Sequence, residues 1–376
     1  MTNIPHPDDP ALEELCRRLR ARSNDLLSCG DWPGEQLRWC GQAGVYQWFM
    51  PRERGGLEWS AEAICRGYEA LSRACLTTTF IITQYMGACQ RIARSERTWV
   101  ADQWLDQLRT GERFATVGIS HLTTSRRHLA KPVLAAQPAN GGYRLAGYSP
   151  WVTGACHADL IVTGATLPDQ RQILCAVPTD APGVHVPPPV RLVALSASCT
   201  GPVEFHDVWV PEEWLLAGPE PEVMKGGVGA GTGGIQTSTL ALGLAHAAID
   251  YLKAESDKRA ELLDVVRSLD ESWQAVFGSL LEVARGSPVP SAEELRHQAN
   301  RLVLRATQAA LTAAKGAGFV EGHPVGRWCR EALFFPGMEL PAERASGPLV
   351  RTGGAGVKIP RAPAGGTVPA PDTPAR

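Results

Sequence analysis

The sequence has no marked excess of charge of either sign. Its 37 lysines and arginines nearly balance its 39 aspartates and glutamates, which gives a formal net charge of −2. No basic stripe stands out along the chain, and a nucleic-acid surface needs such clustered positive charge. We therefore expect no nucleic-acid partner.

Cysteine and histidine patterns typical of metal or redox sites are missing as well. The ten cysteines are scattered, none of them in a C-x-x-C pair, and the nine histidines form no metal-spaced cluster with them. The N-terminus carries no recognisable secretory leader. We therefore expect reduced thiols in a cytoplasmic protein and no metal ligands.

Long apolar runs are scarce. The one uncharged stretch of sufficient length, Gly226–Ile249, opens with glycines and contains Thr232, Gln236 and Thr237. Its apolar content is too low for a membrane-spanning helix. We predict a loop that leads into a buried helix, and no membrane span.

The composition is that of a globular protein, with 44% hydrophobic and 20% charged residues. A chain of 376 residues is too long for a single hydrophobic core, so we expect two or three domains. Helix signals come first, beginning with Asp9-Pro10; strand periodicity starts near Phe114, and helical periodicity returns beyond Pro219. Glycine, proline and alanine dominate the last stretch. The predicted fold class is α+β multidomain, with an N-terminal all-α domain (1–113), a middle antiparallel β domain (114–218), a C-terminal α-helical bundle (219–345) and a disordered tail (346–376).

The stretch Tyr143–Ala165 carries the most specific local pattern. Apolar and polar residues alternate at its start, Gly147 is expected to break that strand, and Leu160–Val162 predicts a second, buried strand. Between the two strands, Trp151 and Thr153 place a flat side chain and a hydroxyl on one side of an extended chain. A planar heterocyclic ligand needs such a surface, although an isolated tryptophan is more often part of a core.

Two serines are predicted to cap helices. Ser60 precedes an apolar helical face, and Ser291 opens a capping box that ends at Glu294. The second of these helices has an alanine-rich inward face, which suits close packing in a bundle or at a subunit interface. Its predicted inward residues are Leu295, Ala299, Leu302, Ala306, Ala310 and Ala313.

Three segments, in a fixed order, resemble the middle domain of the acyl-CoA dehydrogenase family. They are ERFATVGISHL (Glu112–Leu122), WVTG (Trp151–Gly154) and TGPVEFHDVWVP (Thr200–Pro211). The family typically shows an apolar strand ending in Ser/Thr-Glu-Pro, then Trp-x-Thr, then F-x-D-V-x-V-P. A fourth segment, HPVGRWCREA (His323–Ala332), matches the family's Y-P-V-x-R-x-x-R-D-A, so the resemblance covers most of the chain.

The resemblance implies a flavin-dependent oxidoreductase that binds FAD. In that family a carboxylate removes the α-proton of an acyl thioester, usually an acyl-CoA of lipid metabolism, and the β-hydride passes to flavin N5. The resemblance also implies a homodimer or homotetramer, because one subunit's cofactor contacts its partner. The acyl chain and the electron acceptor stay open.

The resemblance assigns cofactor contacts to individual residues. Val117 and Ile119 match the strand beneath the flavin, and Ser120 matches the hydroxyl that meets the flavin pyrimidine. Trp151 and Thr153 match the wall of the ring and its hydrogen-bonding neighbour.

Other assignments concern the C-terminal part and the substrate. Gly316 and Gly318 in KGAGF resemble the glycine turn that takes the partner subunit's cofactor. Counted in register after HPVGRWCREA, the catalytic base falls at Glu339. Arg126 replaces a family serine near the thioester tail, so it is a candidate substrate contact.

The chain also departs from the family pattern. His121-Leu122 replaces Glu-Pro, Thr312 stands where a glutamine commonly meets the cofactor, and Glu255–Asp257 lacks the arginine that binds the pyrophosphate. Without that arginine the phosphates lose a bidentate cation partner. Two alternatives therefore stay open: a flavin monooxygenase on the same fold, and a non-catalytic homologue that has lost flavin.

Overall fold

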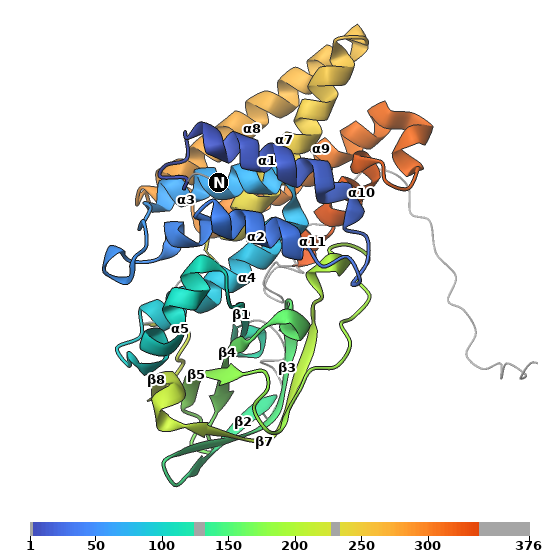
Figure 1. Ribbon diagram of the computed structural model, residues 1–376. Coiled ribbons are helices and arrows are strands. Elements are labelled where there is room, and N and C mark those ends of the chain that lie inside the picture. Colours follow the sequence, from blue (N-terminus) through green and yellow to red (C-terminus); the bar gives the residue numbers. More distant parts are fainter. Residues whose placement is uncertain (1–2, 124–131, 227–233, 338–376) are drawn as a thin grey trace, which may run out of the picture. The chain divides into compact units, whose positions relative to one another are not determined.

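The computed structural model of the chain describes residues 3–123, 132–226 and 234–337 (Figure 1). Four predictions fall wholly or largely outside these residues: Glu339 as the base, Arg126 as a substrate contact, disorder of residues 346–376, and the loop that begins at Gly226. Within the described residues, no helix is both long enough and apolar enough to span a membrane.

The chain begins with helices, as predicted. Asp9 caps the first helix by accepting a hydrogen bond from the Ala11 amide at 2.8 Å, and Ser60 caps another by accepting from the Ala63 amide at 3.2 Å. This part contains α1 (Pro10–Arg22), η1 (Ser23–Asp25), α2 (Gly34–Gln42), η2 (Val45–Phe49), η3 (Arg52–Arg54), α3 (Ala61–Ala74), α4 (Leu76–Ala93) and α5 (Trp99–Thr110), where η denotes a 3-10 helix.

The middle of the chain forms one eight-stranded sheet in the order β6-β7-β3-β2-β4-β5-β8, with β1 paired to β4. Both β1 and β2 run parallel to β4, and the other pairings are antiparallel. The sheet is therefore mixed rather than purely antiparallel, because alternation of side chains does not reveal strand direction. The elements are β1 (Ala115–Gly118), α6 (Ser120–Thr123), β2 (Leu134–Ala139), β3 (Gly142–Val152), η4 (Ala155–His157), β4 (Leu160–Thr166), β5 (Gln172–Pro178), β6 (Val184–His185), η5 (Ser196–Ser198), β7 (Gly201–Pro211), η6 (Glu212–Trp214) and β8 (Leu215–Glu220).

Helices return in the last part, which confirms the α+β fold class. Ser291 caps α9 by accepting from the Glu294 amide at 3.2 Å, and all six residues predicted to point inward from this helix are buried. The elements are α7 (Gln236–Ser256), η8 (Ala260–Leu262), α8 (Leu263–Ala284), α9 (Ala292–Ala314), η9 (Lys315–Phe319), α10 (Pro324–Ala332) and α11 (Phe334–Gly337).

Strand β3 is longer than predicted, because Gly147 does not end it. Gly147 has φ of +129°, and the pairing with β7 shifts register between Leu145 and Gly147. A Cβ at this position would lie 2.2 Å from the Val133 carbonyl oxygen, so only glycine fits there. The strand bends at this bulge and continues to Val152. Trp151 is therefore the second-last residue of β3.

The main hydrophobic core is shared by helices from both ends of the chain, with α3 packed on α7 and α7 on α9 (Figure 1). Gly243 permits the first contact, since a Cβ there would lie 2.6 Å from the Glu69 carbonyl oxygen. The Ser72 hydroxyl also donates to the Leu240 carbonyl at 2.8 Å. A second, smaller core lies within the strands.

A buried ion pair fastens α10 to the start of the chain. Both Arg327 Nη1 distances to the Glu331 carboxylate oxygens are 3.0 Å, and the two side chains are 9% and 2% exposed. The same guanidinium donates to Asn24 Oδ1 at 3.0 Å and to Ser23 Oγ at 3.1 Å. Every charge in this group is therefore hydrogen-bonded, which a buried ion pair requires.

Breaking this pair should destabilise the protein strongly. We expect Glu331→Gln to lower the free energy of unfolding by about 3–5 kcal/mol, because it leaves the Arg327 charge buried without a counter-ion. Urea denaturation followed by circular dichroism measures the change. The control is Glu14→Gln, which breaks an exposed i,i+3 pair with Arg17 within α1 and should have little effect. Equal midpoints for the two variants would contradict the assignment.

Candidate functional site

Strand β1 and the residues after it form the first part of the candidate site. The Thr163 hydroxyl donates to the Gly118 carbonyl at 2.7 Å, and the Thr116 hydroxyl donates to the Thr153 carbonyl at 2.7 Å. These bonds fix β1 to β4 on one side and to the end of β3 on the other. The side chains of Val117 and Ile119, predicted to lie beneath a flavin, are both buried.

Ser120 presents a hydroxyl that the protein does not satisfy. Its Oγ is buried and has no hydrogen-bond partner among the described residues, and the same is true of the Ser149 Oγ on β3. Gly118, the last residue of β1, allows β3 to approach closely, because a Cβ there would sit 2.8 Å from Ser149 Oγ. A buried hydroxyl without a partner costs about 1–3 kcal/mol, so each of these serines is suited to receive a polar group from a ligand.

His121 occupies the position of the family's glutamate and is 6% exposed. Its Nε2 lies 2.7 Å from the Gly164 carbonyl oxygen, which can only accept, so the proton is on Nε2. The Nδ1 lone pair is then buried, and no described residue pairs with it. Burial lowers the pKa of His121, so the imidazole is neutral near pH 7.

The tryptophan and threonine predicted to flank a planar ring differ in accessibility. Trp151 is 49% exposed, so its ring has a free surface for stacking. Thr153 is buried, and its hydroxyl lies 3.0 Å from the Thr200 hydroxyl, which lies 2.8 Å from that of Ser198. The Thr153 hydroxyl has one donor and two lone pairs, so this chain leaves it capacity for a further bond.

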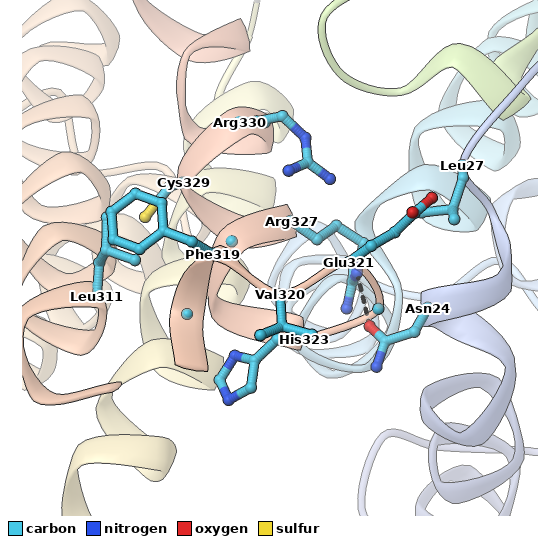
Figure 2. Close-up of a pocket in the computed structure, with 13 residues that line it drawn as sticks. Asn24, Leu27, Leu311, Phe319, Val320, Glu321, His323, Arg327, Cys329 and Arg330 are labelled. Atoms are coloured by element: carbon cyan, nitrogen blue, oxygen red, sulfur yellow. Dashed lines mark hydrogen bonds between the residues drawn. The ribbon is translucent and has the colours of Figure 1, made fainter. Parts of the chain in front are cut away.

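The last two residues of the KGAGF turn, Gly318 and Phe319, line a separate pocket of about 520 Å³ (Figure 2). Gly318 is buried in its wall, and α10 packs tightly on the turn, because a Cβ at Gly326 would sit 2.4 Å from the Gly318 carbonyl oxygen. Gly316 is exposed and does not line the pocket. The lining residues include Leu311, Phe319, Val320, Glu321, His323, Arg327 and Arg330.

Two arginines of α10 line this pocket, and they differ in whether their charge is paired. Arg327 is neutralised by Glu331, whereas the exposed Arg330 takes part in no ion pair within the described ranges. Arg330 is therefore the cation that the pocket can offer to an anionic group. None of the described lining residues comes from β1 or β3. Within one chain, this pocket is therefore separate from the exposed ring of Trp151.

Arg259 was not among the residues expected at the site from the sequence. It follows Glu255–Asp257, the segment from which the family's phosphate-binding arginine is absent. Its guanidinium donates to the Ala313 carbonyl at 2.7 Å and contacts the carboxylates of Glu261 at 3.2 Å and Glu255 at 3.7 Å. Arg259 therefore braces the end of α7 against the end of α9, with its charge already balanced.

The structure also brings together three potential metal ligands. One ligand atom each from Cys156, His157 and Cys199 lie within 4.8 Å of one another. This cluster contradicts the expectation of no metal-spaced group, because Cys199 is remote from the other two residues in the sequence. A hydrogen bond between the two thiols lowers the pKa of Cys156 and raises the pKa of Cys199.

The residues present fit part of the flavin that the family resemblance implies. The unpartnered Ser120 hydroxyl suits the polar edge of a heterocycle, and the exposed face of Trp151 suits its plane. The phosphate side is less complete, because no arginine occupies Glu255–Asp257 and Thr312 uses its hydroxyl to donate to the Gln308 carbonyl.

No protein-family model matches the chain. Among curated relatives, the bovine mitochondrial short-chain specific acyl-CoA dehydrogenase is 22% identical, over 80% of this chain and 78% of its own length. An L-prolyl-(peptidyl-carrier protein) dehydrogenase of Pseudomonas fluorescens is 25% identical, over 54% of this chain and 57% of its own.

Solved structures with this fold include both dehydrogenases and monooxygenases. A glutaryl-coenzyme A dehydrogenase in complex with glutaryl-CoA matches with a TM-score of 0.73 and 18% identity, over 87% of this chain and 91% of its own. A dibenzothiophene monooxygenase from Paenibacillus matches with a TM-score of 0.69 and 18% identity, over 87% and 92%. Another structure of that enzyme contains FMN.

The buried imidazole of His121 makes the stability of the protein depend on pH. The folded-state pKa is lowered, so the unfolded chain takes up a proton near pH 6.5 while the folded chain does so only at lower pH. Stability from this residue is complete above about pH 6.5 and is lost as the pH falls through the folded-state pKa. We expect His121→Gln, which can still donate to the Gly164 carbonyl, to show a shallower loss of unfolding free energy below about pH 6.5. The control is His185→Gln at an exposed position; equal slopes for both variants would contradict the prediction.

Proposed function

Because this chain is a divergent relative of the acyl-CoA dehydrogenases, we propose that it is a flavin-dependent oxidoreductase that uses FAD to dehydrogenate an acyl thioester between Cα and Cβ. The observation that carries this proposal is the buried, unpartnered hydroxyl of Ser120 at the end of β1. It occupies the position at which the family's Ser/Thr meets the flavin pyrimidine.

The described residues can hold such a cofactor from three sides. Val117 and Ile119 supply an apolar floor that excludes water, and Ser120 can donate to the pyrimidine edge. The Trp151 ring can stack along the plane, and the Thr153 hydroxyl, two residues further along the chain, is held by Thr200. When bound there, FAD would supply a hydride acceptor at N5.

Glu339 is the proposed base that takes the α-proton of the substrate. The register after HPVGRWCREA supports this assignment. Shortly before it, the chain passes Phe334 and the fully buried Phe335, and an apolar surround raises the pKa of a carboxylate toward the range needed for proton abstraction. Arg126 remains the proposed contact to the thioester tail.

The cofactor site is proposed to be completed by a second copy of the chain, as a homodimer or homotetramer. The Gly318 pocket contains Arg330, a cation able to bind the phosphates of the partner's cofactor. Phe319 and Val320, which line the pocket, are 79% and 64% exposed. Apolar residues this exposed beside a pocket support a protein contact there.

A flavin monooxygenase is the second candidate, and His121 favours it. Its neutral imidazole replaces a family glutamate and keeps a buried lone pair on Nδ1, which can accept a hydrogen bond without bringing a negative charge into the site. Consumption of oxygen by the flavin-reduced protein with a substrate, without reduction of its flavin by any thioester, would favour this candidate. A purified protein without flavin absorbance, and unable to take up added FAD, would indicate a non-catalytic homologue.

Flavin retention should depend on both parts of the proposed site. We expect Trp151→Ala to weaken FAD binding by about 0.5–1.5 kcal/mol beyond the loss of buried area. Arg330→Gln should weaken it too, by removing a charge-assisted bond to phosphate. The measurement is fluorescence of flavin released on dilution, with Arg301→Gln, an exposed arginine of α9, as control. Retention equal to wild type in Trp151→Ala would reject the proposed ring wall.

The role of Glu339 can be tested by anaerobic reduction of the bound flavin with acyl thioesters, presented both on CoA and on a carrier protein. Glu339→Gln keeps the shape of the side chain and removes its basicity. We expect the variant to retain FAD and to bind the thioester but to lose flavin reduction. Glu271→Gln, at an exposed position of α8 outside the proposed site, is the control. Full reduction by the Glu339→Gln variant would place the base elsewhere.

A further inference from the structure

The cluster of Cys156, His157 and Cys199 lies directly after the Trp151 surface. Cys156 and His157 belong to η4, which follows the end of β3, and Cys199 follows η5. One ligand atom from each lies within 4.8 Å of the others. A tetrahedral zinc ion, with bonds of about 2.0–2.3 Å, needs its ligand atoms roughly 3.5–4 Å apart, so small side-chain rotations would close the site.

The backbone holds the two ligand-bearing segments together. The Gly154 amide donates to the Ser198 carbonyl at 2.9 Å and to the Cys199 carbonyl at 3.2 Å. The His157 amide donates to the Gly154 carbonyl at 2.9 Å, which shapes the turn that carries two of the ligands. The separation of Cys199 from Cys156 and His157 is therefore set by direct hydrogen bonds between main chains rather than by long side chains.

The imidazole of His157 is held by ring stacking rather than by hydrogen bonds of its nitrogens in the described part of the chain. Its ring stacks on Trp32, with 4.3 Å between centroids and 15° between planes. Across the described residues, no hydrogen bond involves either ring nitrogen. Trp32 in turn packs against Gly154, where a Cβ would sit 2.7 Å from the indole. The stack limits ring motion while leaving a nitrogen available, which a metal-binding histidine needs.

We propose that Cys156, His157 and Cys199 bind a divalent cation of the zinc class through two thiolates and one imidazole. Sulfur and nitrogen donors in this combination select zinc over magnesium or calcium. Binding releases the two thiol protons to solvent, and the two thiolates balance the charge of the ion. The fourth position faces solvent, because Cys156 and His157 are both exposed. The ion would clamp the Trp151–Gly154 segment to the start of β7.

The test uses cobalt as a spectroscopic substitute for zinc. The full chain is stripped of metal with a chelator, kept reduced and titrated with Co²⁺. Visible d–d bands and a near-ultraviolet thiolate-to-cobalt charge-transfer band are expected to saturate at one ion per chain. Addition of Zn²⁺ should remove both. This readout needs neither flavin nor substrate, so its outcome is independent of the proposed enzymatic function.

Variants distinguish this site from other thiols. Cys156→Ser changes an exposed side chain and should abolish the charge-transfer band in a protein with unchanged circular dichroism; Cys199→Ser should do the same. The control is Cys29→Ser: the Cys29 carbonyl lies 3.1 Å from Cys199 Sγ, but its thiol is outside the cluster, so the band should persist. A reduced, folded wild type without the band would overturn the proposal, as would a band that survives in Cys156→Ser. A Cys156–Cys199 disulfide that forms in place of metal binding under these conditions would also overturn it.

Discussion

Strand β4 has to satisfy two hydrophobic cores at once, and the rest of the structure depends on that constraint. Leu160 and Val162 face the core that the helices build, whereas Ile161 and Ala165 face the core within the strands. Because successive side chains of a strand point to opposite faces, a slip of one residue would exchange the two sets. The register of β1 against β4, and with it the position of Ser120, follows from this double burial.

The same constraint explains how a short strand can present reactive groups. Strand β1 has four residues, all buried, and side-chain hydroxyls of Thr116 and Thr163 anchor it to backbone carbonyls on both sides. A segment anchored in this way cannot move to satisfy the polar atoms that follow it. The unpaired atoms of Ser120 and His121 are therefore held in place, which is the preorganisation that a binding site needs.

Local signals in the sequence were sufficient for the helices and their caps. Asp9, Ser60 and Ser291 each cap a helix as predicted, because capping depends on a few neighbouring residues. The order of helices, strands and helices followed from periodicity in the same way. The parallel pairing of β1 with β4 was not predicted, nor was the continuation of β3 through Gly147, because both depend on contacts with chain segments that are distant in sequence.

Only those residues of the candidate site that lie in family motifs could be predicted from the sequence. The family motifs led to Ser120 and Trp151, but they gave no information on Arg259 or on the meeting of Cys199 with Cys156, which tertiary packing decides. Thr153 shows the intermediate case: the motif selects the residue, and the structure adds that its hydroxyl is already bonded to Thr200. Chemistry at the site therefore has to be judged from contacts as well as from register.

The shared helical core has a consequence for how the protein is made. Helix α3 packs on α7, and Arg327 of α10 bonds to Ser23 and Asn24 near the start of the chain. During synthesis the first helices can pack on one another, but the face of α3 that meets α7 stays uncovered while the sheet is being translated. Contacts of such large sequence separation form late and slowly. The first helices therefore complete their packing only after the last part of the chain has been made.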